Sequence, residues 1–182
     1  MPLRSTTPAL VLRTRNYGEK DRWITLLTPE DGRIDVLAKG VRSLTSKRRS
    51  ALQAGNLIRC SWTSKGQSDF HILTETTYEE SLFQITGSLD RVRDFTAVLE
   101  IVHYLALEAF EQEEYSASAI QVLRYVGQAT DYNRAVVRKL LLQLAEMQGV
   151  VAEHQQRDQM SASDVLESVL GRKIRSFAYL RV

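Results

Sequence analysis

Apolar and polar residues alternate along the first half of the chain with a period of two, which predicts a series of short β-strands. Turn-forming residues interrupt the alternation at hairpin spacing. The segment 29–32, Pro-Glu-Asp-Gly, is a strong turn because proline fixes one φ angle and glycine accepts a positive one. We therefore expect five strands, at residues 9–15, 22–28, 33–39, 57–63 and 69–76.

The alternation also predicts which side chains share a face of each strand. In the first strand Leu10 and Leu12 fall on one face, and Val11, Arg13 and Arg15 fall on the other. Five short antiparallel strands with a long connection between the third and fourth favour an OB-fold barrel, although an SH3-like barrel has a similar strand count. The predicted inward residues of the other strands are Ile24, Leu26, Ile34, Val36, Ala38, Ile58, Cys60, Phe70 and Ile72.

After Leu82 the apolar period changes to 3.6, which is typical of amphipathic helices. The predicted fold class is thus α+β, all-β and then all-α, with an OB-fold nucleic-acid-binding domain at 1–82 and a helical domain at 83–182. The expected helices run from a Ser88 N-cap to about 111, over 117–127, from a Thr130 cap to a closing Gly149, and from Ser161 or Ser163 to about Gly171.

Composition narrows the class of protein. The chain has 182 residues, of which 43% are hydrophobic and 25% charged, and this is typical of a folded protein. A single cysteine, Cys60, excludes an intramolecular disulfide framework, and the three scattered histidines do not suggest a metal site. No apolar run long enough to span a bilayer and no secretory leader pattern occur. We expect a cytoplasmic protein without membrane contact.

Motifs of catalysis are missing from the sequence. The glycines are single turn residues rather than a phosphate-binding loop, and no Gly-x-Ser-x-Gly, His-Glu-x-x-His or Cys-x-x-Cys pattern occurs. Cys60 alternates with Ile58 and is expected to be a buried, inert thiol, while His71 and His103 are expected to have packing or surface roles. We predict no enzymatic activity, no catalytic residue, no metal and no cofactor.

Basic residues are concentrated in the first half of the chain. Residues 1–82 contain 13 lysines and arginines against 9 acidic residues, whereas the remainder contains 11 against 13. Local basic surfaces attract polyanions more than net charge does. Outward strand positions can also be plain solvated surface, and tryptophans can be core residues. The candidate DNA-binding residues are Arg13, Arg15, Arg33, Lys39, Arg42, Lys47, Arg48, Arg49 and Arg59, with Tyr17, Trp23 and Trp62 as candidates for base stacking.

The order of residues resembles the bacterial RecO family of recombination mediators. The N-terminal resemblance is carried by residues 9–19 (ALVLRTRNYGE), Asp21-Arg22, Leu26-Leu27-Thr28, Gly32 and 38–42 (AKGVR), followed by Ala51-Leu52-Gln53. Weaker similarity continues at 138–141 (RKLL), at Gly149 and in the basic motif at 171–176 (GRKIRS).

The resemblance implies a DNA repair protein that binds single- and double-stranded DNA and anneals complementary strands. It also implies RecR and the C-terminal tail of single-stranded DNA-binding protein as partners, RecA as an indirect partner, and a nucleoid-associated location in the cytoplasm. The residues that would contact the partner tail are Arg138, Lys139, Arg172, Lys173 and Arg175.

The chain departs from the family in one respect. Many members carry four zinc-binding cysteines after the helix that here ends near Gly149, and this sequence has none there. Because the chain starts with Met1 and keeps the C-terminal motif, we expect a compact, zinc-free member. Two other hypotheses fit the same residues: an RNA-binding barrel module, and a non-catalytic scaffold that binds peptides.

Overall fold

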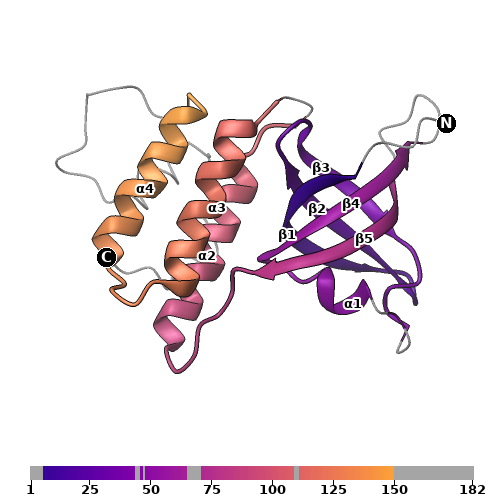
Figure 1. Ribbon diagram of the computed structural model, residues 1–182, viewed down its shortest axis with the longest axis horizontal. Helices are drawn as coiled ribbons and strands as arrows, with labels where there is room; N and C mark the ends of the chain where they lie inside the picture. The colour runs from indigo at the N-terminus through magenta and orange to yellow at the C-terminus, as the bar shows by residue number, and fades with distance from the viewer. Residues whose placement is uncertain (1–5, 44–45, 47, 65–70, 109–110, 150–182) are drawn as a thin grey trace.

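Five strands close into a barrel in the first half of the chain, in the order β1-β2-β3-β5-β4 with β4 returning to β1 (Figure 1). The pairing of β3 with β5 is parallel, and the other pairs are antiparallel. This topology confirms the predicted OB-fold barrel. The computed structural model describes residues 6–43, 46, 48–64, 71–108 and 111–149. The strands are β1 (Thr7–Tyr17), β2 (Asp21–Thr28), β3 (Gly32–Ala38), β4 (Asn56–Ser64) and β5 (His71–Ser81).

A β-bulge in β1 changes the face on which its arginines lie. The pairing of β1 with β2 shifts between Val11 and Arg13, so an extra residue interrupts the alternation. Val11 is buried inside the barrel, while Leu10 and Leu12 pack toward the helices. Arg13 and Arg15 are exposed on this outer side. The prediction that they share a face with Val11 is therefore wrong, because the bulge shifts the phase by one residue.

The barrel interior is apolar and holds most of the predicted inward residues. The shift in pairing of β4 with β5 after Ser61 places Leu73 inside, whereas Ile72, predicted to point inward, is half-buried and lies outside this cluster. Phe70 and the expected fourth helix lie outside the described residues. The interior cluster consists of Ala9, Val11, Ile24, Leu26, Ile34, Val36, Ala38, Val41, Ala51, Leu52, Ile58, Cys60, Trp62 and Leu73.

Four helices are described: a short α1 (Arg48–Ala51) between β3 and β4, and then α2 (Leu89–Leu105), α3 (Glu113–Gln128) and α4 (Arg134–Met147). Ser88 caps α2 as predicted, because its hydroxyl accepts a hydrogen bond from the Arg91 amide. The cap of α4 is Asn133 rather than Thr130. The end of α2 comes earlier than expected, since the chain after Leu105 becomes extended and the carbonyl of Leu107 accepts a hydrogen bond from the Arg33 amide at 2.8 Å.

The outer face of β1 and the helices share a second core. Leu10 and Leu12 of the barrel lie in one buried cluster with Phe95 and residues of all three long helices. The contact is close: a Cβ built on Gly127 of α3 would come within 1.8 Å of the carbonyl oxygen of Leu82. The helices therefore cover one side of the barrel (Figure 1). The domain boundary at residue 82 stays a prediction.

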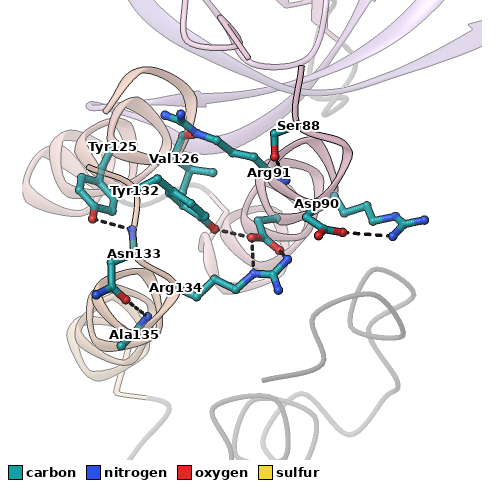
Figure 2. A network of polar contacts seen from close by, with 11 residues as sticks. Ser88, Asp90, Arg91, Tyr125, Val126, Tyr132, Asn133, Arg134 and Ala135 are labelled. Atoms are coloured by element: carbon teal, nitrogen blue, oxygen red, sulfur yellow. Dashed lines mark hydrogen bonds and ion pairs between the residues drawn. The ribbon is translucent and has the colours of Figure 1, made fainter. Parts of the chain in front are cut away.

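A polar network joins the N-terminal part of α2 to the ends of α3 and α4 (Figure 2). The Arg91 guanidinium donates to the carbonyls of Val126 at 2.5 Å and Ala129 at 2.6 Å, which have no partner within the last turn of α3. The fully buried Asp94 carboxylate accepts two hydrogen bonds from Arg134, at 2.7 and 3.1 Å, and a third from the Tyr132 hydroxyl. This network fixes the position of α4 relative to α2.

Candidate nucleic-acid interface

A pocket of about 450 Å³ lies where the outer face of the barrel meets the end of α2. The barrel side is formed by alternate residues of three adjacent strands, because in a pleated sheet such residues point to the same face. The helix side comes from the last turn of α2 and the segment after it. The described lining residues are Arg13, Arg15, Trp23, Thr25, Arg33 and Asp35 from the barrel, and His103, Tyr104 and Glu108 from the helix side.

Arg33 lies in the wall of this pocket and ties the barrel to the helices. Its guanidinium donates to the main-chain carbonyl of His103 at 2.6 Å and to the Glu108 carboxylate at 2.5 Å. The Arg33 side chain is 22% exposed, so it is largely committed to these contacts. Its prediction as a DNA-binding residue is untested, and the structure assigns it a structural contact as well.

Arg13 and Arg15 line the pocket without forming an ion pair to any described residue. Both are exposed, and among the residues that the structure describes no carboxylate lies within ion-pair distance of either guanidinium. The nearby Asp35 carboxylate instead accepts a hydrogen bond from the Thr25 hydroxyl at 2.5 Å. The two guanidinium groups are thus available to an anionic ligand.

Two of the three predicted stacking residues lie beside these arginines. Trp23 pairs with Arg15 across β1 and β2 and lines the pocket. Tyr17 is 52% exposed and packs edge-on against Trp23, with ring centroids 5.8 Å apart. Trp62 is only 3% exposed and lies inside the barrel, so its assignment as a stacking residue is wrong. It shares the inward phase of Cys60, two residues before it in β4.

The basic connection after β3 forms a separate group of cations. Arg42 donates to the carbonyl of Gly18 at 2.5 Å, and Arg48 donates to the carbonyls of Lys39 at 2.9 Å and Thr74 at 3.4 Å. These bonds to neutral carbonyl oxygens hold the connection on the barrel, and no carboxylate among the described residues forms an ion pair with either guanidinium. Lys39 and Arg49 are exposed, and Lys47 lies outside the described residues.

Arg59 does not join either group. It lies on β4, and its guanidinium forms an ion pair with Glu79 of β5 at 2.6 Å. The candidate DNA-binding residues of the strands therefore do not all share one surface. The strands curve around a closed barrel, and β4 faces a different direction from the outer side of β2 and β3.

His103 is one of the pocket residues that sequence reasoning missed. Its Nδ1 atom is buried without a hydrogen-bond partner in the described part of the chain. Burial, and then the charges of Arg33 and Arg13, lower its pKa to about 4, so the ring is neutral at pH 7. Periodicity gave no signal for this position, since its neighbours in space come from strands some seventy residues earlier in the chain.

The structure describes two of the five residues predicted to contact the partner tail. Arg138 and Lys139 line a shallow pocket of about 330 Å³ along α4, together with Leu142 and Glu146. Arg172, Lys173 and Arg175 lie outside the described residues. The assignment of a partner tail to this face of α4 stays a prediction.

The described residues were also compared with the requirements of a metal site and of a membrane-spanning helix. Within the described ranges no group of three or more His, Cys, Asp or Glu side chains is placed to share a metal ion. Cys60, the one cysteine of the sequence, is buried in the barrel, so these 182 residues do not fit the four-cysteine zinc set. The predicted burial of Cys60 is confirmed, and this burial raises the pKa of its thiol to about 12. None of the described helices combines the length and apolar character needed to cross a membrane.

The barrel topology, the helices packed on it and the exposed arginine pair beside two aromatic rings define an OB-fold protein with a basic surface. Residues 1–82 match the family model described as Recombination protein O N terminal. This match and the relatives below show that the N-terminal part of the chain is similar to the RecO family.

Proteins named DNA repair protein RecO are similar over longer stretches. That of Heliobacterium modesticaldum is 36% identical over 98 residues, which are 54% of this chain and 35% of the relative. That of Chlorobaculum parvum is 34% identical over 98 residues, 54% of this chain and 38% of the relative. That of Salinibacter ruber is 28% identical over 144 residues, 79% of this chain and 55% of the relative. The matched region thus spans about a third to a half of each relative.

Proposed function

We propose that this protein binds DNA in DNA repair and that the outer face of β1 and β2 is its binding surface. The observation that carries the proposal is the pair Arg13 and Arg15, exposed and without a carboxylate partner in the described residues, beside Trp23 and Tyr17. Guanidinium groups neutralise phosphates, and aromatic rings stack on unpaired bases without regard to sequence. Similarity of the N-terminal part of the chain to proteins that are named DNA repair protein RecO supports the same function.

The strength and salt dependence of binding follow from the cations that are free to bind. Arg13, Arg15, Lys39 and Arg49 are exposed and form no ion pair among the described residues. Four contacts to a single strand give a slope of log affinity against log salt of about −2.8, or about a fiftyfold loss between 50 and 200 mM salt. Binding that does not change with salt would contradict the proposal.

A double variant tests the surface directly. Replacing Arg13 and Arg15 with glutamine should reduce the slope to about −1.4 and weaken binding to all sequences equally, because phosphate contacts carry no base code. The matched control replaces Arg93 and Arg124, two exposed arginines of the helices that form ion pairs with Asp90 and Glu80. The control removes the same charge and should keep the wild-type slope in a fluorescence anisotropy titration.

We further propose that the protein anneals complementary strands. A basic surface that neutralises phosphates on two strands lowers their repulsion, so pairing can nucleate without any chemical turnover. The test follows two complementary fluorescent oligonucleotides, precoated with single-stranded DNA-binding protein, with and without this protein. Acceleration that is lost in the Arg13 and Arg15 variant supports annealing on this surface, and an unchanged rate with intact DNA binding refutes it.

The proposed partners are RecR, the acidic tail of single-stranded DNA-binding protein, and RecA through strand loading. Arg138 and Lys139 on α4 are the described residues proposed for the tail. Their replacement with glutamine should abolish binding of a tail peptide without changing the DNA affinity. Competition with RNA of equal length distinguishes an RNA-binding module, and lack of affinity for both nucleic acids would favour a peptide-binding scaffold.

A further inference from the structure

The segment that follows α2 borders the pocket beside Arg13 through Glu108, and its main chain is hydrogen-bonded to the barrel. After α2 the segment 106–108 runs against the start of β3, where the amide of Arg33 donates to the carbonyl of Leu107 at 2.8 Å and Glu108 forms bridges with Gly32 and Arg33. The amide of Gln112 also donates to the carbonyl of Pro29 at 2.6 Å. A nucleic-acid strand lying on the outer face of β1 and β2 would meet the helix side of the pocket, where His103, Tyr104 and Glu108 line it.

The described side chains that line the pocket include more arginines than carboxylates. The Glu108 carboxylate pairs with Arg33, and Asp35 is the only other acidic residue among the described lining residues. Arg13 and Arg15 therefore leave the pocket with an excess of positive charge. Burial is the main cause of the lowered pKa of His103, and the charges of Arg33 and Arg13 lower it further, against the smaller opposite effects of Asp35 and Glu100.

We propose that this pocket binds a phosphate monoester, either at the end of a nucleic-acid strand or on a free mononucleotide. A terminal phosphate carries up to two negative charges, whereas an internal phosphodiester carries one, and two open guanidinium groups suit the larger charge. Because the last turn of α2 and Glu108 border the pocket on the helix side, the end of a strand fits there better than its middle. Trp23 lines the pocket on the barrel side and Tyr104 on the helix side, so both lie near the position of the attached nucleoside. For the strand end, the inference rests on the proposed DNA-binding surface.

The experiment compares oligonucleotides of one sequence that end in a 5′-phosphate, a 3′-phosphate or hydroxyl groups only. One phosphorylated end should bind about tenfold tighter than the hydroxyl form, as expected for charge-assisted hydrogen bonds. An oligonucleotide one nucleotide longer, with hydroxyl ends, controls for the added charge and should gain less than twofold. Competition with inorganic phosphate or a mononucleotide should remove the tenfold gain and leave the binding of the hydroxyl form.

Two single variants test whether the preference for a phosphorylated end depends on the pocket. Arg13→Gln should abolish the preference for the phosphorylated end, and Arg124→Gln, an exposed helix arginine that forms an ion pair with Glu80, should keep it. Quenching of tryptophan fluorescence by a mononucleotide, lost in Arg13→Gln, would support the free nucleotide as a ligand even if strand ends are not preferred.

Several outcomes would overturn the inference. Equal affinities for all three ends without mononucleotide binding would refute the monoester pocket and leave the proposed DNA-binding surface intact. A preference that survives Arg13→Gln would place the phosphate elsewhere. Failure of every oligonucleotide to bind would refute the proposed function, and the mononucleotide titration would then decide the pocket by itself.

Discussion

Replacement of Arg134 with alanine should strongly destabilise the helices, because it leaves a carboxylate charged and buried. Asp94 is fully buried, and two of its three described hydrogen bonds come from the Arg134 guanidinium. Breaking a buried ion pair by removing one partner costs about 3–5 kcal/mol. Since the Arg134 side chain is 34% exposed, water can partly replace it, and we expect the lower end, about 3 kcal/mol.

The assay is equilibrium unfolding in urea, followed by circular dichroism, with a thermal scan as a second measure. For a chain of this size, about 3 kcal/mol corresponds to a decrease in the melting temperature of roughly 10 °C. The control is Arg124→Ala, which removes the exposed ion pair with Glu80 and should cost about 0.5 kcal/mol.

A double variant separates the charge from the packing. Asp94→Ala removes the buried carboxylate, so adding Arg134→Ala to it should cost much less than Arg134→Ala costs in the wild type. Additive costs, or a single Arg134→Ala variant no less stable than the Arg124 control, would refute the idea that the arginine compensates a buried charge.

Three further predictions concern other buried groups. The thiol of Cys60 should not react with a thiol reagent at pH 8 in the folded protein and should react fully in urea, and rapid labelling of the native state would contradict its burial. His103 keeps a folded pKa of about 4 against an ordinary value of 6.5, so the unfolded chain binds the proton first and stability should fall as the pH decreases from 6.5 to 4. We expect a loss of about 1–2 kcal/mol at pH 5, and a His103→Gln variant should show a smaller loss in urea titrations at pH 7.5 and 5. Gly127→Ala should destabilise by about 2 kcal/mol or more although alanine favours helices, because its Cβ would collide with the main chain at Leu82, and a stabilised variant would contradict that close approach.

The strands and the main helices were predictable because each depends on residues close together in the sequence. Alternation located all five strands, and the glycine turn at 32 and the Ser88 cap marked element ends correctly. The inward phase of Ile58 and Cys60 also contained the information that Trp62 is buried. The error there came from the interpretation of the pattern rather than from the pattern.

The bulge in β1 was not predictable in the same way. An extra residue between Val11 and Arg13 shifts the side-chain phase, and nothing in the local alternation marks it. The exposed positions of Arg13 and Arg15 were expected, but their placement on the side of Leu10 and Leu12 depends on this irregularity. The arginines consequently face the end of α2 instead of open solvent alone.

The sequence by itself determined a five-stranded barrel followed by helices, an N-terminal excess of basic residues and the resemblance to the RecO family. Only the tertiary structure decided which basic side chains bind a carboxylate or carbonyl partner and which remain without a carboxylate partner in the described residues. Arg33 is bound by a helix end seventy residues later, and Arg59 by the neighbouring strand, whereas Arg13 and Arg15 have no carboxylate partner in the described chain. Periodicity reports the burial of each residue along its own element, but the partner of a charge is set by packing between elements distant in sequence.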